Sequence, residues 1–130
     1  PYLEHENTPF WEKRNLIPPR SQRYHLSLRM IALLRILMPD INIAATTALQ
    51  TIDPSGLERG LAAGANVFMP NLTPLKYRRN YNLYEGKVEV HDTLEEIVEK
   101  MVQRCKAIGR PVDLGDPGDP RHYLARIGRV

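Results

Sequence analysis

Two short apolar stretches, each followed by small polar residues, are the main feature of the hydrophobic pattern. Residues 41–45 (INIAA) and 65–69 (ANVFM) have the length of buried strands, and a helical pattern over residues 53–64 lies between them. Strands that alternate with helices through short connections are typical of a parallel sheet. The pattern therefore predicts an α/β fold built from βα units.

Two signals compete for the start of the helix between these strands. Asp53 followed by proline is a good cap and first residue, while Ser55 with Glu58 would form a capping box. Gly64 is a natural end for this helix. A second cap-plus-proline start predicts a helix over residues 75–83.

The clearest helix is predicted over residues 27–38, where apolar side chains recur at three- and four-residue steps. Pro39 ends it, because proline disfavours helical geometry in the residue before it. We expect this helix to lie on the sheet, with Met30 and Met38 filling the core.

Another amphipathic helix is predicted over residues 94–108, capped by Asp92 or Thr93. Its acidic residues come early and its basic residues late, which suits the helix dipole. Cys105 lies on its apolar face and is expected to be a buried thiol.

The ends of the chain carry weaker signals. Residues 1–8 fit the end of a strand that runs into a loop. Residues 10–23 are expected to be mostly irregular, with room for a turn of helix near residues 11–15, and residues 87–90 to form a short extended piece. We expect residues 1–110 to form one region and residues 111–130, rich in Gly, Pro and Asp, to be an irregular tail. The first residue is a proline, so we expect a fragment of a longer protein.

Composition narrows the function classes. The net charge of +3 is too small to require a nucleic-acid partner, and it suits an anionic ligand equally well. A single cysteine excludes an intrachain disulfide and a self-sufficient cysteine metal site. The chain shows neither a membrane-spanning stretch nor a signal peptide, so we expect a cytoplasmic protein without a membrane partner.

The polar residues after the two strands are the best candidates for ligand binding. Ligands sit at the carboxyl ends of parallel strands, where Thr46, Thr47 and Asn71 offer hydroxyl and amide groups. Met69 would line the floor of a pocket. The alternative is that the threonines satisfy turns, the asparagine caps a helix, and the methionine belongs to the core.

Two further groups of side chains are candidates for a function. Tyr77, Arg78 and Tyr81 could bind an anion or stack bases, or they could simply pack on the sheet and face solvent. His5 lies between two glutamates, but neighbouring strand residues point to opposite faces, so we expect no metal site there. The sequence indicates no catalytic residue.

Several of these segments resemble one family. The segments are PYLEHENTPF, LMPDINIAATTALQTIDPSGLERGLAAGANVFMPNLTPLKYR and YNLYEGK. They are similar to the carboxyl-terminal half of the HydE family, the radical S-adenosylmethionine maturases of [FeFe]-hydrogenase. The similarity to biotin synthase and the domain shared by biotin- and thiamin-synthesis enzymes is more distant. The resemblance covers about residues 1–90 and implies a (β/α)8 TIM barrel: the end of strand 6, βα units 7 and 8, and a carboxyl-terminal helix.

The resemblance also implies roles for individual residues. Thr46 and Thr47 would hold a carboxylate or another anion of the substrate, and Met69, Asn71 and Tyr77 would line the substrate cavity. Tyr2 and Leu3 would lie near the adenine of S-adenosylmethionine. The substrate would be a small molecule or an iron complex, and other hydrogenase maturation proteins would be partners.

Two departures from the family pattern limit what this chain does alone. The CxxxCxxC motif that binds the [4Fe–4S] cluster is absent, so we expect activity only from a full-length enzyme. The cysteines of an auxiliary cluster are also absent, so we expect none. The alternatives are a biotin synthase-like radical enzyme of another pathway, or a non-enzymatic module that binds anions or nucleic acid.

Overall fold

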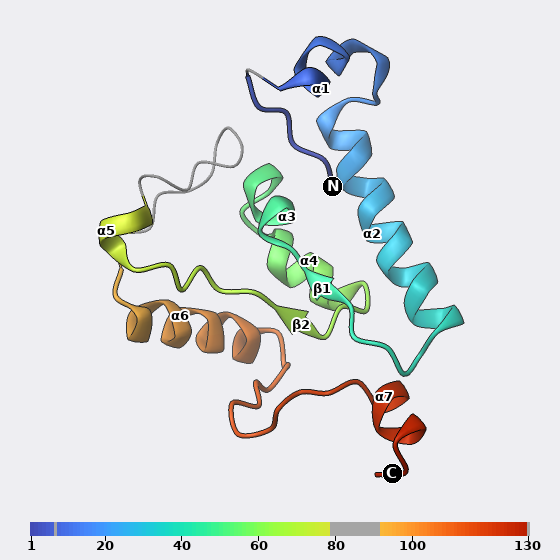
Figure 1. The fold of residues 1–130 in the computed structure, drawn as a ribbon, viewed down its shortest axis with the longest axis vertical. Helices are drawn as coiled ribbons and strands as arrows, with labels where there is room; N and C mark the ends of the chain where they lie inside the picture. Colours follow the sequence, from blue (N-terminus) through green and yellow to red (C-terminus); the bar gives the residue numbers. More distant parts are fainter. Residues whose placement is uncertain (7, 79–91, 130) are drawn as a thin grey trace.

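The computed structural model describes residues 1–6, 8–78 and 92–129 and shows helices arranged around a two-stranded parallel sheet (Figure 1). The elements in chain order are α1 (Pro9–Glu12), the 3-10 helix η1 (Arg14–Leu16), α2 (Arg20–Leu37), β1 (Ala44–Ala45), α3 (Thr47–Ile52), α4 (Gly56–Ala62), β2 (Val67–Phe68), α5 (Leu75–Arg78), α6 (Leu94–Ala107) and α7 (Arg121–Arg126).

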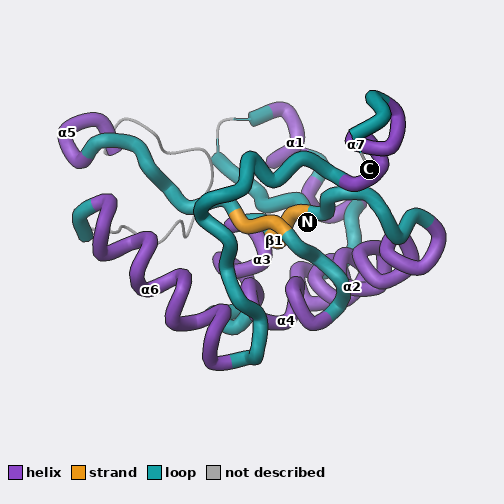
Figure 2. Tube along the Cα trace, turned by 90° about the horizontal axis from the view of Figure 1, so that it is seen from below, coloured by secondary structure: helices purple, strands orange, loops and turns teal. Residues whose placement is uncertain are grey.

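The predicted parallel pairing is confirmed, with strands shorter than expected. Ala44 pairs with Val67 and Ala45 with Phe68 in a parallel register. The connection between the strands runs through α3 and α4, and Figure 2 shows α2, α3 and α4 on one side of the strands. An α/β arrangement is therefore present in the described part of the chain.

The core lies between the sheet and these helices. Small residues allow close approach here: a Cβ atom on Gly60 of α4 would lie only 3.0 Å from the Cβ atom of Ala45. The buried cluster consists of Tyr24, Ile31, Ile43, Ala45, Leu49, Leu57, Leu61, Ala65, Met101 and Cys105. The prediction of a buried Cys105 is confirmed.

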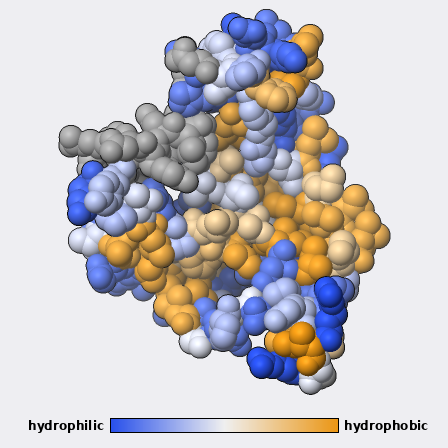
Figure 3. Space-filling view, viewed as in Figure 1, coloured by the Kyte–Doolittle hydropathy of each residue, from blue (hydrophilic) through white to orange (hydrophobic). Residues whose placement is uncertain are grey.

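Helix α2 differs from its prediction in length and orientation. It begins at Arg20, with Pro19 at the N-cap, and not near residue 27. The expectation that Met30 and Met38 fill the core is wrong, because these side chains are 54% and 44% exposed. The helix is apolar on most sides, but only its face with Tyr24 and Ile31 reaches the core. Figure 3 shows an apolar area over the end of α2.

The segment after β1 also differs from its prediction. Helix α3 was not expected, and it begins directly after Thr46. Neither predicted start of the following helix forms as expected. Ser55 is the N-cap residue of α4 but makes no capping hydrogen bond, and the Asp53 carboxylate accepts hydrogen bonds from the Ser55 backbone N–H (2.9 Å) and hydroxyl (2.7 Å). The capping box fails because Glu58 binds Arg104 of α6 instead.

Helix α6 follows its prediction closely. Thr93 is the N-cap and forms a capping box with Glu96, and Gly109 follows the helix at a φ of 70°. The predicted helix over residues 75–83 is seen as α5 (Leu75–Arg78); the rest of it, and the predicted extended piece over 87–90, lie outside the described residues.

The two ends of the chain need correction. Residues 1–6 form no strand, so Tyr2 and Leu3 do not continue the sheet. Residues 10–23 are more regular than expected, because they include parts of α1 and α2 and all of η1. The tail is irregular over residues 111–120 but ends in α7. None of the described helices combines the length and apolar character needed to cross a membrane.

Candidate functional site

The predicted ligand-binding residues of the two strands lie at one end of the sheet. Because Ala45 pairs with Phe68 in a parallel register, Thr46 and Met69 leave the carboxyl ends of adjacent strands side by side. Met69 is 63% exposed, so it is a surface side chain in the described chain and not part of the core. The chain leaves the carboxyl end of β2 toward the side of the molecule on which α5 lies (Figure 1).

Thr46 carries the most informative polar group of this end. Its backbone is extended and precedes α3, but its side chain makes no capping hydrogen bond. Its Oγ1 atom is buried and has no hydrogen-bond partner among the described residues. Buried hydroxyl groups are nearly always hydrogen-bonded, so this hydroxyl can donate a hydrogen bond to a ligand or accept one from it. The exposed Thr47 is the first residue of α3.

Asn71 and Tyr77 lie further along the chain from the sheet. The Asn71 Oδ1 atom accepts a hydrogen bond from the backbone N–H of Thr73 at 3.2 Å, which is a local turn contact ahead of α5. Tyr77 is 53% exposed on α5, and the Lys76 ammonium lies 4.8 Å from its ring centroid.

Tyr2 and Leu3 belong to a separate cluster beside α2. Leu3 is buried, while the ring of Tyr2 lies 5.5 Å from that of Phe10. The buried guanidinium of Arg23 binds both the Tyr2 carbonyl and the Glu4 carboxylate. Burial alone would raise the pKa of Glu4, but a backbone hydrogen bond and Arg23 lower it below its usual value. This ion pair fixes the first residues against α2.

A metal centre has no support in the described residues. No group of three or more His, Cys, Asp or Glu side chains there is arranged to hold an ion. His5 makes a local contact, in which its Nδ1 atom donates to the Glu6 carbonyl at 2.6 Å. The described chain therefore places polar groups of Thr46 and Thr47 at the carboxyl end of β1.

Comparison with known proteins identifies the relationship. The chain is 42% identical over 110 residues to the [FeFe] hydrogenase maturase subunit HydE of Thermotoga maritima. This match covers 85% of the chain and 30% of the relative. The resemblance to HydE is confirmed. No protein-family model matches the chain. The chain spans 30% of the relative's length, so the match concerns one region of that relative.

At the other end of the sheet, this HydE-like region has a network that the sequence did not reveal. Arg35 donates to the carbonyls of Gly64 (2.8 Å), Pro39 (2.7 Å) and Ile41 (2.9 Å), and to the Oδ1 atom of Asn66 (2.9 Å). That Oδ1 atom also accepts from the Ile43 N–H at 2.8 Å. The network joins the end of α2 to the starts of both strands. An arginine within an apolar helix was its only sequence signal.

A second unexpected cluster joins α6 to α3 and α4. Arg104 binds Glu58 through two hydrogen bonds of 2.6 and 2.8 Å, Gln50 at 2.9 Å and the Pro54 carbonyl at 3.0 Å. The Arg104 hydrogen bond, together with its charge, lowers the pKa of Glu58 against the opposing effect of burial. The cluster holds α6 in place.

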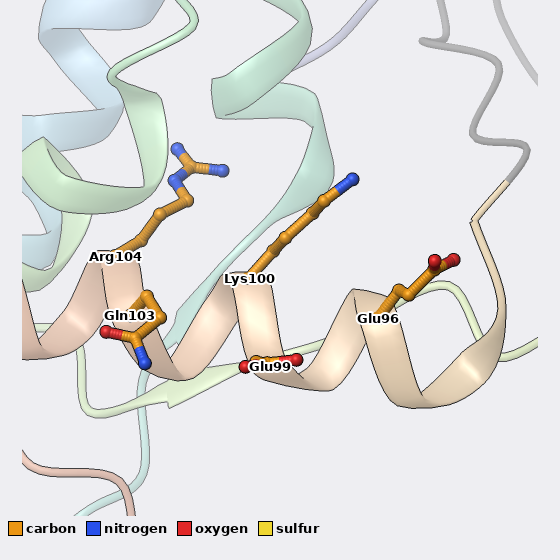
Figure 4. A pocket seen from close by; sticks show the side chains of 5 residues that line it. All are labelled: Glu96, Glu99, Lys100, Gln103 and Arg104. Atoms are coloured by element: carbon orange, nitrogen blue, oxygen red, sulfur yellow. The ribbon is translucent and has the colours of Figure 1, made fainter.

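A shallow pocket of about 440 Å³ lies on the same face of α6. In Figure 4, Lys100 and Arg104 extend from one side of the helix, while Glu99 and Gln103 lie lower on it. Lys100 is already paired with Asp92 at 2.8 Å. The paired charges give this pocket a structural role in the HydE-like region, and it lies apart from the strand ends.

Proposed function

We propose that this chain is part of a radical S-adenosylmethionine maturase of the HydE type and contributes half of its substrate cavity. In this proposal β1 and β2 are strands 7 and 8 of a (β/α)8 barrel. Their carboxyl ends position the substrate, and residues outside this chain generate the radical that attacks it. The product of the whole enzyme is a precursor of the hydrogenase H-cluster.

The observation that supports the site most strongly is the hydroxyl of Thr46 at the end of β1, which has no hydrogen-bond partner among the described residues. It stands beside the other strand end, and Ala44 and Ala45 before it are small enough for a ligand to approach the backbone. A substrate oxygen that accepted its hydrogen bond would remove the cost of a buried, unsatisfied hydroxyl. In the proposal Thr47, Met69, Asn71 and Tyr77 complete this wall of the cavity.

The cofactors of the proposed enzyme need residues from outside this chain. A [4Fe–4S] cluster of the CxxxCxxC type takes three thiolates, whereas this chain has one cysteine, and that one is buried in the core. The chain therefore does not hold the cluster. For S-adenosylmethionine it offers only Tyr2 and Leu3, and the Tyr2 ring is already packed against Phe10. No reaction step is assigned to these residues.

The experiment is anaerobic reconstitution of the full-length gene product, followed by two separate assays. Cleavage of S-adenosylmethionine to 5′-deoxyadenosine tests the radical enzyme, and activation of an [FeFe]-hydrogenase in a maturation mixture tests the HydE role. If the cluster-loaded protein makes no 5′-deoxyadenosine, the proposal that it is a radical S-adenosylmethionine enzyme is contradicted. Cleavage without hydrogenase activation favours a biotin synthase-like enzyme of another pathway.

A further inference from the structure

The tail after α6 folds back toward the sheet. The backbone N–H of Arg110 binds the Cys105 carbonyl at 2.9 Å, which reverses the chain at the end of α6. Val112 then packs against the core cluster. Figure 1 shows the tail passing beyond β2 to α7, which lies near the turn between α2 and β1.

Two aspartates shape this return. The Asp113 Oδ1 atom accepts hydrogen bonds from the N–H groups of Gly115 (2.9 Å) and Asp116 (3.2 Å). The Asp116 Oδ1 atom accepts from the N–H of Gly118 at 2.9 Å, and Gly118 has a φ of 74° that favours glycine. The irregular segment thus has its own local hydrogen bonds.

The far end of the tail is attached to the α2–β1 connection at two places. Asn42 donates to the Gly118 carbonyl at 2.8 Å. The His122 N–H donates to the Asp40 carbonyl at 3.1 Å, and the His122 Nδ1 atom lies 3.1 Å from the Asp40 carboxylate. Asn42 is itself held by the Asn66 side chain at 2.8 Å, so the attachment continues into the network at the strand starts.

Between the tail and the sheet lies a groove of about 1050 Å³. Its walls include Phe68 of β2, Cys105 of α6, and Val112 and Arg121 of the tail. Cys105 is the single cysteine of the chain and only 2% exposed. Burial first, and the nearby Glu58 carboxylate second, raise the pKa of its thiol.

We propose that residues 110–126 form a strap whose latch to Asp40 and Asn42 closes this groove and shields the Cys105 thiol. Release of the latch lets the strap lift from β2 while the core between the sheet and α2–α4 stays folded. The strap is therefore a conformational device that controls access to the groove. The latch lies at the starts of the strands, while the groove extends along β2 as far as Pro70. The inference does not depend on the proposed function.

The test is the rate at which Cys105 reacts with Ellman's reagent in the 130-residue chain. The thiolate attacks the reagent's disulfide, forms a mixed disulfide and releases one coloured thionitrobenzoate. The Asn42→Ala/His122→Ala variant loses the side-chain hydrogen bonds of Asn42 to Gly118 and Asn66 and that between His122 and the Asp40 carboxylate, while the His122 backbone bond to Asp40 remains. This loss should raise the rate about three- to tenfold. Trypsin cleavage after Arg121 should accelerate in parallel. Asp119→Asn, which removes a tail charge without touching the latch, should leave both rates unchanged.

The far-ultraviolet circular dichroism spectrum of the double variant should equal that of the unaltered chain. A labelling rate within twofold of the unaltered chain, in a variant with that spectrum, overturns the proposal. Hydrogen exchange on the unaltered chain provides a measurement that needs no variant. The latch predicts a protected His122 amide, and exchange of this amide at the rate of an unfolded peptide also overturns the proposal.

Discussion

Replacement of Arg104 by glutamine should destabilise the chain by detaching α6 from α3 and α4. The arginine makes four hydrogen bonds of 2.6 to 3.0 Å, two of them to the Glu58 carboxylate. These contacts join residues 46 to 54 positions apart in the sequence, so they are long-range tertiary contacts.

The size of the stability loss follows from how far the two paired side chains are exposed to solvent. The side chains of Arg104 and Glu58 are 33% and 24% exposed, so solvent screens the pair only in part. Exposed ion pairs contribute about 0–1 kcal/mol, whereas hydrogen bonds to charged groups contribute about 1.5–3 kcal/mol. We therefore expect Arg104→Gln to lower the free energy of unfolding by about 2 kcal/mol.

The effect should depend on pH in a definite direction. Arg104 lowers the pKa of Glu58 in the folded chain below its ordinary value of 4.5. A group with a lowered pKa stabilises the fold above its unfolded pKa, and this contribution is lost as the pH falls through the folded value. The difference in the free energy of unfolding between Arg104→Gln and the unaltered chain should therefore be largest near pH 7 and should decrease below about pH 4.

Urea unfolding at pH 7 and pH 3, followed by circular dichroism, measures both effects. Lys100→Gln is a matched control on the same helix, because Lys100 pairs with Asp92 at 2.8 Å but its side chain is 62% exposed. We expect the control to change stability by less than about 0.5 kcal/mol. If the two variants have equal effects, or if the effect of Arg104→Gln does not change with pH, our interpretation of the cluster is refuted.

Three further predictions concern packing and the open surfaces. Gly56→Ala should prevent cooperative folding, because the new Cβ atom would lie 2.3 Å from the backbone of Leu49; a thermal melt like that of the unaltered chain would contradict this. Asn66→Ala should lower the free energy of unfolding by about 2 kcal/mol in urea, because the side chain has hydrogen bonds to Ile43, Arg35 and Asn42; no change would show that water replaces them. The 130-residue chain alone should self-associate or be poorly stable, because the sheet has two open edges in the described part of the chain and α2 exposes apolar side chains; a monomer at all concentrations with a cooperative melt would refute this.

The features that sequence could predict depend on local chemistry. The parallel βα arrangement follows from two apolar runs separated by a helical pattern, and the ends of α6 follow from the Thr93 capping box and Gly109. Each of these signals lies within a few residues of the feature that it specifies.

The features that sequence missed depend on contacts between distant segments. Helix α2 is apolar on most sides, so periodicity could not select the face with Tyr24 and Ile31. The roles of Arg35 and Arg104 require partners that only the folded chain brings near. For the candidate site, the strand ends were predicted correctly as adjacent, but the partnerless hydroxyl of Thr46 was visible only in the structure.

The most direct test of the proposed function separates substrate positioning from radical generation. The full-length, cluster-loaded protein and its Thr46→Val variant would be compared in hydrogenase activation and in the cleavage of S-adenosylmethionine without substrate. Loss of a hydrogen bond to substrate should reduce activation about tenfold or more, while cleavage without substrate stays within about twofold. Unchanged activation by a correctly folded variant, or equal loss in both assays, would contradict a substrate-positioning role for the end of β1.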